Sequence, residues 1–298
     1  MPSEKNDLSI SIVIYKTDPV VLHQALTSIA NSTMTSKLYV IDNSPNKELR
    51  QIVEGFASTY IHTGKNIGFG PGHNLALKNI GNSSKYHLLL NPDISFGTAV
   101  LDELRRFLDA NPHIGWVMPN VLYPDGSRQK LCKRLPTPWD LFNRRFLMAF
   151  GLKMPFGNRG RFECNDLDLS RPRRIPCLSG CFAFVRTDLL QAAGGFDERF
   201  FMYLEDTDLV RRIGEIAPTV FYPHVSVYHA HARGSYRSLK LLAHHLLSTV
   251  RYFRKWGWFF DRKRMEINRS IDRDERTIVL PDRSPAWRSG EDQKLHAS

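Results

Sequence analysis

The chain has 298 residues, of which 42% are hydrophobic and 24% are charged, and its formal net charge is +11 at pH 7. This composition is that of an ordinary globular protein, and the length suffices for one large α/β domain or two smaller ones. The four cysteines lack the paired spacing of a structural zinc site, which excludes that class of site, and we expect free thiols of a cytosolic protein.

The positive charge is concentrated in two segments. Residues 125–175 hold 12 Lys and Arg against 5 Asp and Glu, and residues 237–269 hold 9 against 2, so each segment has a net charge of +7. Such blocks indicate an anionic partner, and the composition leaves open a nucleic acid, a phospholipid surface or a diphosphate-bearing substrate. No apolar run reaches the length of a signal peptide or a membrane span, so we expect neither.

The N-terminal half alternates between strands and helices. Runs rich in β-branched and apolar residues predict strands at 9–15, 38–41, 60–61 and 86–90. Helices are expected to begin at Pro19 and near Lys47. This alternation predicts a parallel, doubly wound sheet that binds its ligand at the carboxyl ends of the strands.

Two connections in this half carry groups suited to a ligand. The glycine-rich segment 64–74 opens onto a helix, so it is either a plain turn or a loop that a ligand approaches closely. It matches neither the dinucleotide fingerprint nor the P-loop. Asp93 follows the strand at 86–90 in the sequence Asn91-Pro92-Asp93, where it suits either a divalent cation or a helix cap.

Residues 123–175 interrupt this pattern. The segment contains several prolines and the first basic block, so we expect an irregular functional insertion or lid. Order returns with a strand at 175–186, in which small residues such as Gly180 allow close approach to a ligand.

The stretch 194–212 contains the most distinctive acidic residues. A Gly194-Gly195 turn leads into the apolar residues 200–203, and Glu205 and Asp206 then begin a predicted helix. Carboxylates at a helix N-terminus are stabilised by the macrodipole. The acidic pair is therefore either a helix cap or a catalytic base that the apolar residues keep partly dry.

The C-terminal part begins with a strand at 225–228 that runs into His229 and His231, which suit a metal ion, whereas a lone histidine is usually structural. A long helix is expected from Leu239 to Arg264. One apolar stripe of this helix comprises Leu239, Leu242, Leu246, Val250, Phe253, Trp256 and Phe260. Aromatics interleaved with cations at 251–264 predict a helix on a membrane surface, with core packing as the alternative. From residue 270 we expect a disordered tail.

Together these motifs resemble those of inverting family 2 glycosyltransferases of the GT-A fold, and more narrowly those of bacterial rhamnosyltransferases of O-antigen and related polysaccharides. The resemblance covers about residues 8–265, and its most specific part is the run from Gly194-Gly195-Phe196-Asp197-Glu198 to Glu205-Asp206-x-Asp208-Leu209. Asp42-Asn43-Ser44 resembles the nucleotide-contacting loop of the family, and residues 66–74 resemble its second donor loop. Asn91-Pro92-Asp93 resembles its metal motif, and residues 229–235 resemble its C-terminal histidine motif.

The resemblance implies an α/β fold with a mixed, mostly parallel central sheet flanked by helices, a catalytic domain at 1–236 and an amphipathic basic helix at 237–269. It implies that Asp206 is the general base, assisted by Glu205. The implied donor-binding residues are Tyr15, Asp42, Asn66, Gly68, Phe69, Asn74, Asn91 and Asp93. The residues expected beside the acceptor are Gly180, Asp197, Arg233 and Ser235. The implied Mg²⁺ or Mn²⁺ would be held by Asp93, His229 and His231.

The implied reaction moves a sugar, with L-rhamnose from dTDP-rhamnose as first choice, from a nucleotide-diphosphate donor to a lipid-diphosphate-linked or growing polysaccharide. Galactose, N-acetylglucosamine and galactofuranose are the alternative sugars. The expected place is the inner face of the bacterial cell membrane, on an anionic surface, with no nucleic-acid partner. Two positions depart from the family pattern, because Lys16 stands where Asn is common and Asn91 stands where a carboxylate is usual. A nucleic-acid-binding module and a nucleotidyltransferase are the competing classes.

Overall fold

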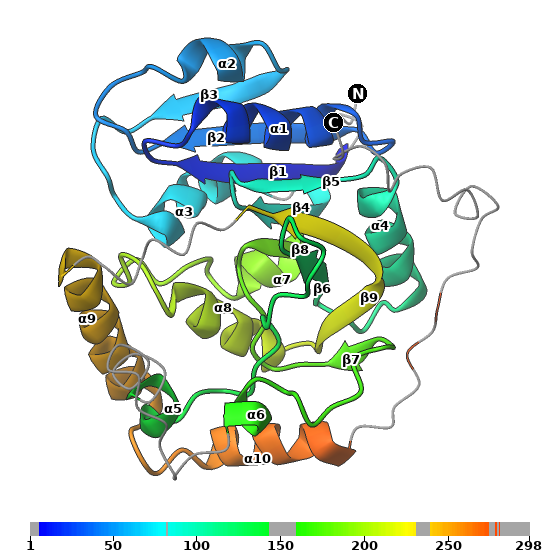
Figure 1. The fold of residues 1–298 in the computed structure, drawn as a ribbon, viewed down its shortest axis with the longest axis vertical. Helices are drawn as coiled ribbons and strands as arrows, with labels where there is room; N and C mark the ends of the chain where they lie inside the picture. The colour runs from blue at the N-terminus through cyan, green and yellow to red at the C-terminus, as the bar shows by residue number, and fades with distance from the viewer. Residues whose placement is uncertain are drawn as a thin grey trace.

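The computed structural model describes residues 6–81, 83–142, 159–230, 239–273, 278 and 280. Within them the chain forms a nine-stranded sheet packed between helices (Figure 1). The strands are β1 (Asn6–Ile14), β2 (Ser36–Asp42), β3 (Ser58–His62), β4 (Ser84–Leu90), β5 (Ile94–Phe96), β6 (Trp116–Leu122), β7 (Arg173–Arg174), β8 (Phe182–Arg186) and β9 (Thr219–His229). The helices are α1 (Pro19–Ala30), α2 (Arg50–Glu54), α3 (Phe69–Ile80), α4 (Val100–Ala110), α5 (Pro138–Phe142), α6 (Arg159–Phe162), α7 (Thr187–Ala192), α8 (Glu205–Gly214), α9 (Leu239–Trp256), α10 (Arg262–Ser270) and the 3₁₀ helix η3 (Ile271–Arg273).

The sheet is mixed and mostly parallel, as the sequence predicted. Its strands follow the order β3-β2-β1-β4-β8-β6-β9-β5, and β7 pairs with β9. Strands β1 to β4 pair in parallel, as do β6 and β9, whereas β5, β7 and β8 run antiparallel to their neighbours. The carboxyl ends of six strands therefore share one edge of the sheet with the amino ends of β5 and β8.

The central strands are buried on both faces. Ile10, Ile12 and Ile14 of β1 have no exposed surface, and neither do residues 88–90 of β4 or 182–185 of β8. Near-continuous apolar runs are what a strand needs when helices cover both of its faces. The apolar runs that identified these strands in the sequence thus have a direct physical cause.

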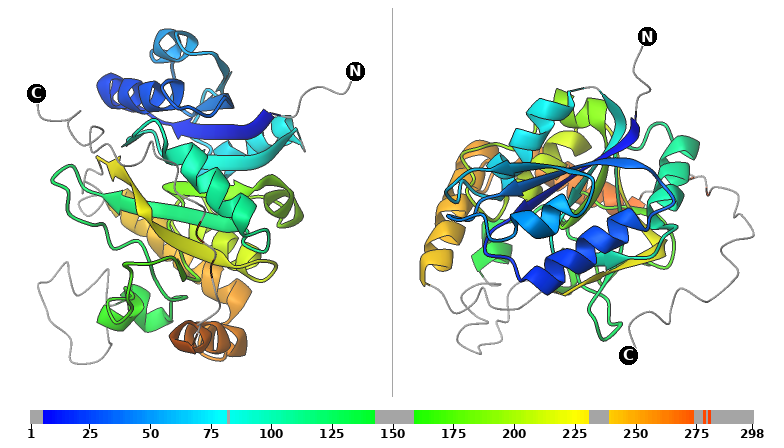
Figure 2. Two further views of the ribbon diagram at one scale, coloured as in Figure 1. Left: turned by 90° about the vertical axis from the view of Figure 1, so that its right-hand side faces the viewer. Right: turned by 90° about the horizontal axis from the view of Figure 1, so that it is seen from above.

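Helices α3 and α4 lie on opposite faces of the sheet. On one face His73 of α3 hydrogen-bonds to Ser11 of β1 at 2.7 Å, and on the other Tyr86 of β4 donates its hydroxyl to Asp109 of α4 at 2.6 Å. Figure 2 gives the side and top views of this layered arrangement. The helices cover the two faces of the sheet. The edge formed by the carboxyl ends of the six strands is followed by the loops that contain predicted site residues.

The expected single helix from Leu239 to Arg264 is wrong. Helix α9 ends at Trp256 and α10 begins at Arg262. Gly257 between them has a φ of +95°, a left-handed conformation that turns the chain and that glycine adopts without a steric penalty. The structure therefore presents two helices joined by a short aromatic loop.

The expected insertion and tail are more ordered than predicted. Residues 123–142 and 159–175 are described and contain α5, α6 and β7, while 143–158 lie outside the described residues. Arg134 donates to the carboxylates of Asp166, at 2.8 and 2.9 Å, and of Asp272, at 2.5 Å. Ile271 is buried beside this contact. The packed fold therefore extends through η3, past the predicted start of the tail at 270.

The structure describes all four cysteines. Cys132, Cys164, Cys177 and Cys181 are buried, and no disulfide joins any two of them. Among the described helices, none combines the length and the apolar character needed to cross a bilayer.

Candidate active site

Three of the predicted site residues, Asp93, Gly180 and His229, lie at the ends of separate strands along one edge of the sheet. Register places the end of β4 beside the start of β8, and the Asn91 N–H donates to the Cys181 carbonyl at 2.8 Å. The start of β5 pairs with the end of β9, where the Ala230 N–H donates to the Asp93 carbonyl at 3.0 Å. Asp93, His229 and Gly180 are therefore neighbours although the sequence separates them widely.

Asp42, which was predicted to contact the nucleotide, is the last residue of β2. Asp42 is fully buried, and its two carboxylate oxygens accept from the Ser44 N–H at 2.8 Å and from the Tyr60 hydroxyl at 2.6 Å. Ser44 in turn accepts from the Lys16 N–H at 2.9 Å, next to Tyr15, which is 46% exposed at the end of β1. Asp42 thus fixes the loop that follows it, and its contact with a nucleotide stays a prediction.

The glycine-rich loop packs against the segment that precedes the acidic pair. Gly68 has a φ of +102°, and a Cβ at this position would lie 2.5 Å from the Phe201 carbonyl oxygen, so only glycine fits. The Phe69 N–H donates to the same carbonyl at 3.2 Å. Asn66 accepts from the Gly68 N–H at 3.0 Å and Asn43 donates to the Gly68 carbonyl at 3.0 Å. The loop is therefore a specific structure and not a plain turn.

Asn74 joins this loop region to the Gly194-Gly195 turn. Its side-chain amide donates to the Phe196 carbonyl at 2.9 Å, and its oxygen accepts from the Phe196 N–H at 2.8 Å. Gly195 has a φ of +65°, and a Cβ there would lie 2.6 Å from the Asn74 oxygen. The structure gives Asn74 a positioning role between two loops, and its contact with the donor stays a prediction.

Asp93 and His229 form a paired site at the strand edge. The Asp93 carboxylate lies 3.2 Å from the His229 Nε2, and the Asn91 amide lies 3.5 Å from the same nitrogen. The other ring nitrogen, Nδ1, lies 3.0 Å from the Gln129 side-chain oxygen. The Gln129 amide donates to the carbonyls of His229 and Leu122, at 3.0 and 3.3 Å. These donations fix the orientation of the amide.

The orientation of Gln129 determines the tautomer of His229. Because the oxygen of Gln129 faces Nδ1, this nitrogen carries the proton, and Nε2 turns toward Asp93. An imidazole nitrogen and a carboxylate that face each other at this distance share one cation, either a proton or a metal ion. Oxygen and imidazole ligands suit Mg²⁺ or Mn²⁺. The residues therefore fit a divalent ion, held by two side chains in this part of the chain.

The remaining predicted ligands and contacts cannot be placed. His231, Arg233 and Ser235 lie outside the described residues. Among the described residues, no group of three His, Cys, Asp or Glu side chains could by itself hold a metal ion. The metal site thus rests on the Asp93–His229 pair, and further ligands stay a prediction.

Asp206 occupies the first turn of α8 and faces the start of β8. One carboxylate oxygen accepts from the Gly180 N–H at 3.0 Å, and the other accepts from the Thr207 N–H at 2.7 Å. A Cβ at Gly180 would lie 2.9 Å from the Cβ of Asp206, so glycine is required for this approach. Asp206 is partly exposed. The Thr207 hydroxyl also donates to the second oxygen at 3.3 Å, whereas the oxygen that faces Gly180 keeps a second lone pair for another donor. The side chain is fixed and accessible, as a general base must be.

Glu205 has a different environment. It is 7% exposed, and one of its oxygens has no hydrogen-bond partner among the described residues. Burial, and then the charge of Asp206, raise the pKa of Glu205 from 4.5 to about 8. Glu205 is therefore mostly protonated at neutral pH.

The turn before α8 is strained. Tyr203 and Leu204 have φ values of 69° and 63°, and two consecutive non-glycine residues rarely adopt this left-handed conformation. Leu204 is buried in a cluster with Phe200 and with Tyr252 and Phe253 of α9. Packing against α9 thus holds the turn that presents Glu205 and Asp206.

Buried ion pairs attach α9 to α8. Asp208 has no exposed surface and accepts from the ammonium of Lys255, at 2.7 Å, and from the indole of Trp256, at 2.8 Å. Lys255 also donates to Asp197 at 2.9 Å. Arg199 and then Lys255 hold the pKa of Asp197 well below its usual range. Asp197 is thus turned toward α9, and its predicted acceptor contact has no support in this geometry.

The comparison with known proteins agrees with this arrangement. The model of the family described as glycosyl transferase family 2 matches residues 9–194, more than half of the chain. The chain belongs to glycosyltransferase family 2. The enzyme class that the motifs predicted is thereby confirmed.

Two relatives of this family 2 glycosyltransferase have similar sequences. N-acetylglucosaminyl-diphospho-decaprenol L-rhamnosyltransferase of Mycobacterium tuberculosis is 29% identical over 234 residues, which are 74% of this chain and 75% of the relative. Rhamnosyltransferase WbbL of Escherichia coli is 26% identical over 248 residues, which are 80% and 86% of the two chains. The predicted resemblance to rhamnosyltransferases is confirmed.

A solved structure confirms the expected GT-A fold. Mannosyltransferase PcManGT from Pyrobaculum calidifontis, in complex with GDP-Man and Mn²⁺, has a TM-score of 0.55 at 14% identity, over 91% of this chain and 75% of that chain. At this identity the likeness concerns the fold.

Sequence reasoning missed some residues of the glycosyltransferase site. Gln129 lies in the segment interpreted as an irregular insertion, 100 positions before His229, and no local pattern connects the two. Asn43 belongs to a quoted motif, but its bond to the Gly68 carbonyl could not be anticipated. Lys255 was assigned to a membrane surface, whereas it pairs with Asp208.

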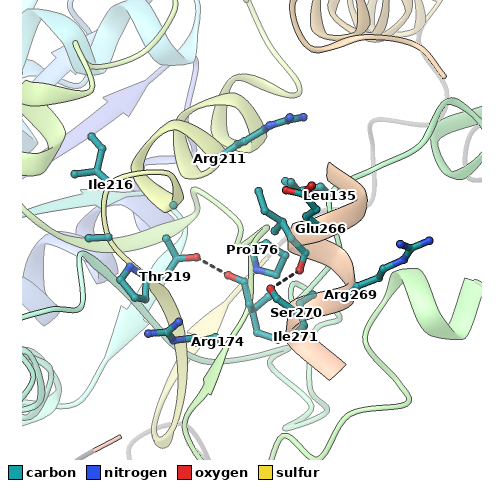
Figure 3. A pocket seen from close by; sticks show the side chains of 15 residues that line it. Leu135, Arg174, Pro176, Arg211, Ile216, Thr219, Glu266, Arg269, Ser270 and Ile271 are labelled. Atoms are coloured by element: carbon teal, nitrogen blue, oxygen red, sulfur yellow. Dashed lines mark hydrogen bonds between the residues drawn. The ribbon is translucent and has the colours of Figure 1, made fainter. Parts of the chain in front are cut away.

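A cavity of about 800 Å³ lies at the other end of α8 (Figure 3). Arg174, Thr219, Glu266 and Arg269 line it, together with Ile216 beyond the carboxyl end of α8. Asp206 and His229 stand at the opposite ends of α8 and β9, so this cavity is separate from the catalytic centre.

Proposed function

We propose that this family 2 enzyme transfers L-rhamnose from dTDP-rhamnose to a lipid-diphosphate-linked saccharide, with inversion at the anomeric carbon. The observation that carries the proposal is the fixed carboxylate of Asp206 at the same strand edge as the Asp93–His229 pair. The choice of sugar and acceptor rests on the similar relatives, one of which is an N-acetylglucosaminyl-diphospho-decaprenol L-rhamnosyltransferase.

The donor would lie across the strand ends. Its nucleotide would rest near Tyr15 and the loop after Asp42, and its diphosphate would reach Asp93 and His229. A divalent ion bound there, Mg²⁺ or Mn²⁺, would offset the negative charge of the departing diphosphate. The solved mannosyltransferase of the same fold is in complex with Mn²⁺ and its nucleotide sugar, which supports this choice of ion. Gln129 would keep the His229 ring in the required tautomer.

Asp206 would act on the acceptor. It would take the proton of the acceptor hydroxyl while that oxygen forms a bond to the anomeric carbon on the face opposite the diphosphate. The bond from the anomeric carbon to the diphosphate oxygen breaks, and the nucleotide diphosphate leaves with the electron pair. Glu205, neutral at pH 7, would avoid placing a second negative charge beside Asp206.

The acceptor side would face a membrane. A lipid-linked acceptor places the reaction at a bilayer surface, and we assign the enzyme to the inner face of the bacterial cell membrane. A nucleic-acid-binding module is disfavoured because residues 9–194 match the model of a glycosyltransferase family.

The test is a donor screen with the purified protein and a synthetic N-acetylglucosaminyl-diphospho-lipid acceptor. dTDP-rhamnose should give product with inverted anomeric configuration by NMR, while UDP-galactose, UDP-N-acetylglucosamine and UDP-galactofuranose should not. Asp206→Asn should slow product formation by roughly 10²–10⁴. Asp188→Asn, at an exposed position on α7, is the matched control. Preferential use of another donor would overturn the choice of rhamnose.

A further inference from the structure

Exposed apolar side chains gather on α9, α10 and the loop between them. Of twelve large hydrophobic side chains that are exposed in the described part of the chain, seven are Leu246, Leu247, Val250, Trp258, Phe259, Phe260 and Met265. We call these seven the apolar rim, since both helices lie at the periphery of the fold in Figure 1. Phe259 is 65% exposed and Phe260 is 96% exposed. Concentrations of this kind mark interaction surfaces.

Part of α9 is packed against the rest of the protein. Tyr252 and Phe253 are completely buried in a cluster with Phe200 and Leu204, and the Ser248 hydroxyl donates to the Met202 carbonyl at 2.8 Å. Helix α9 therefore buries Tyr252 and Phe253 against the protein, while Leu246, Leu247 and Val250 keep 40–46% of their surface exposed. The apolar stripe expected from the sequence is thus only partly covered, because Phe253 is buried while Leu246 and Val250 are exposed.

Buried polar contacts hold the loop in a fixed shape. The Arg211 guanidinium donates twice to Asp261, at 2.7 and 2.9 Å, and both side chains are buried. Asp261 also accepts from the Arg264 N–H at 2.9 Å, and the Arg264 guanidinium donates to the carbonyls of Trp258 and Phe259 at 3.4 Å. The outward position of the loop aromatics is thus built into the fold.

Cations flank the apolar rim. Arg254, Arg262 and Lys263 are exposed, and residues 237–269 have a net charge of +7. Lys255 and Arg264, which were expected on the same surface, point into the protein instead. The outward charge therefore comes from fewer residues than the sequence suggested. Lys263 also pairs with Glu215, beyond the end of α8, at 3.0 Å, and Glu266 is exposed on α10, so cations outnumber carboxylates near the exposed aromatics but are not the only charges there.

We propose that the apolar rim inserts into the surface of an anionic lipid bilayer, with Phe259 and Phe260 deepest and Arg254, Arg262 and Lys263 on the lipid phosphates. Aromatic rings and cations in this arrangement suit the boundary between headgroups and acyl chains. The complementary charge favours a bilayer over a second copy of this basic chain.

The following advantage of membrane attachment, which is that it brings the catalytic residues close to a lipid-linked acceptor, rests on the proposed function. Helix α8 begins with the acidic pair, and its residues Asp208 and Arg211 contact Trp256 and Asp261 at the base of the rim. Insertion would hold Asp206 close to the membrane surface, where a lipid-diphosphate would present its sugar.

The test is flotation of the purified full chain with vesicles of phosphatidylglycerol and phosphatidylcholine, or of phosphatidylcholine alone. The wild type should bind the anionic vesicles at low salt and be released by high salt. Phe259→Ser with Phe260→Ser should weaken binding about tenfold or more. Arg254, Arg262 and Lys263 changed to Gln should weaken binding to anionic vesicles. Val20→Ser with Ile216→Ser, two exposed apolar residues elsewhere, is the matched control and should bind as the wild type does.

Three outcomes would overturn the proposal. The wild type could stay in solution with anionic vesicles, the double Phe variant could bind as well as the wild type, or the rim could instead mediate a dimer, seen by light scattering, that the same variant dissociates. Sugar transfer to a short-chain, water-soluble acceptor separates this proposal from the proposed function. The double Phe variant should keep that activity and lose transfer to vesicle-embedded acceptor. Absence of transfer to any acceptor, with vesicle binding intact, would instead refute the proposed function.

Discussion

Replacing Glu205 by Gln tests the electrostatics of the acidic pair. In the folded protein the pKa of Glu205 is raised to about 8, first by burial and then by Asp206, whereas in the unfolded chain it returns to about 4.5. Between these two values the folded state keeps a proton that the unfolded state has released. The free energy of unfolding of the wild type should therefore fall by about 1.4 kcal/mol per pH unit across this window, or about 5 kcal/mol in total. Gln is neutral in both states and escapes this loss.

Urea unfolding followed by circular dichroism from about pH 5 to about pH 8 measures the difference. Glu205→Gln should have nearly wild-type stability at the acidic end and become progressively more stable than the wild type as the pH rises. Glu48→Gln, at an exposed position between β2 and α2, should follow the wild-type curve. If the curves of wild type and Glu205→Gln stay parallel over the whole range, Glu205 ionises as an ordinary exposed carboxyl and the reasoning from burial fails.

Four further predictions concern catalysis and the metal site. Asp206→Asn should lower kcat by roughly 10²–10⁴ while donor affinity, measured by calorimetry, is kept, and near-normal turnover would disprove the assignment of the base. Gly180→Ala should lower kcat by about tenfold or more, because its Cβ would clash with the Cβ of Asp206 and displace that side chain; unchanged kinetics would count against this contact. Gln129→Leu should weaken Mn²⁺ binding by roughly 10–100-fold in a calorimetric titration, since His229 loses its orienting acceptor, and an unchanged Kd would refute that role. Asp93→Ala should weaken donor binding and turnover together, and full wild-type activity in excess chelator would exclude a metal requirement.

The sequence by itself determined the strands and the chemistry at their ends. Runs of β-branched and apolar residues located β1, β2 and β4 because a strand covered on both faces needs apolar residues at nearly every position. Polar residues such as Asp42 and Asp93 follow these runs, and they marked where each strand ends because a strand covered on both faces rarely contains a charged residue. Motif resemblance then gave the family, since Asp206 and its glycine turn lie within one short stretch of chain.

Only the tertiary structure decided which of these groups meet and which remain charged. Gln129 and His229 are 100 positions apart, and the pairing of β6 with β9 brings them together. The protonation of Glu205 follows from burial that no local pattern reports. Likewise, helical periodicity places Leu246 and Phe253 on one stripe but does not show how far along the helix the protein covers that stripe, so Phe253 is buried while Leu246 is exposed. Periodicity and turn chemistry act over a few neighbouring residues, whereas hydrogen-bond partners, pKa values and exposure depend on segments that only the folded chain brings together.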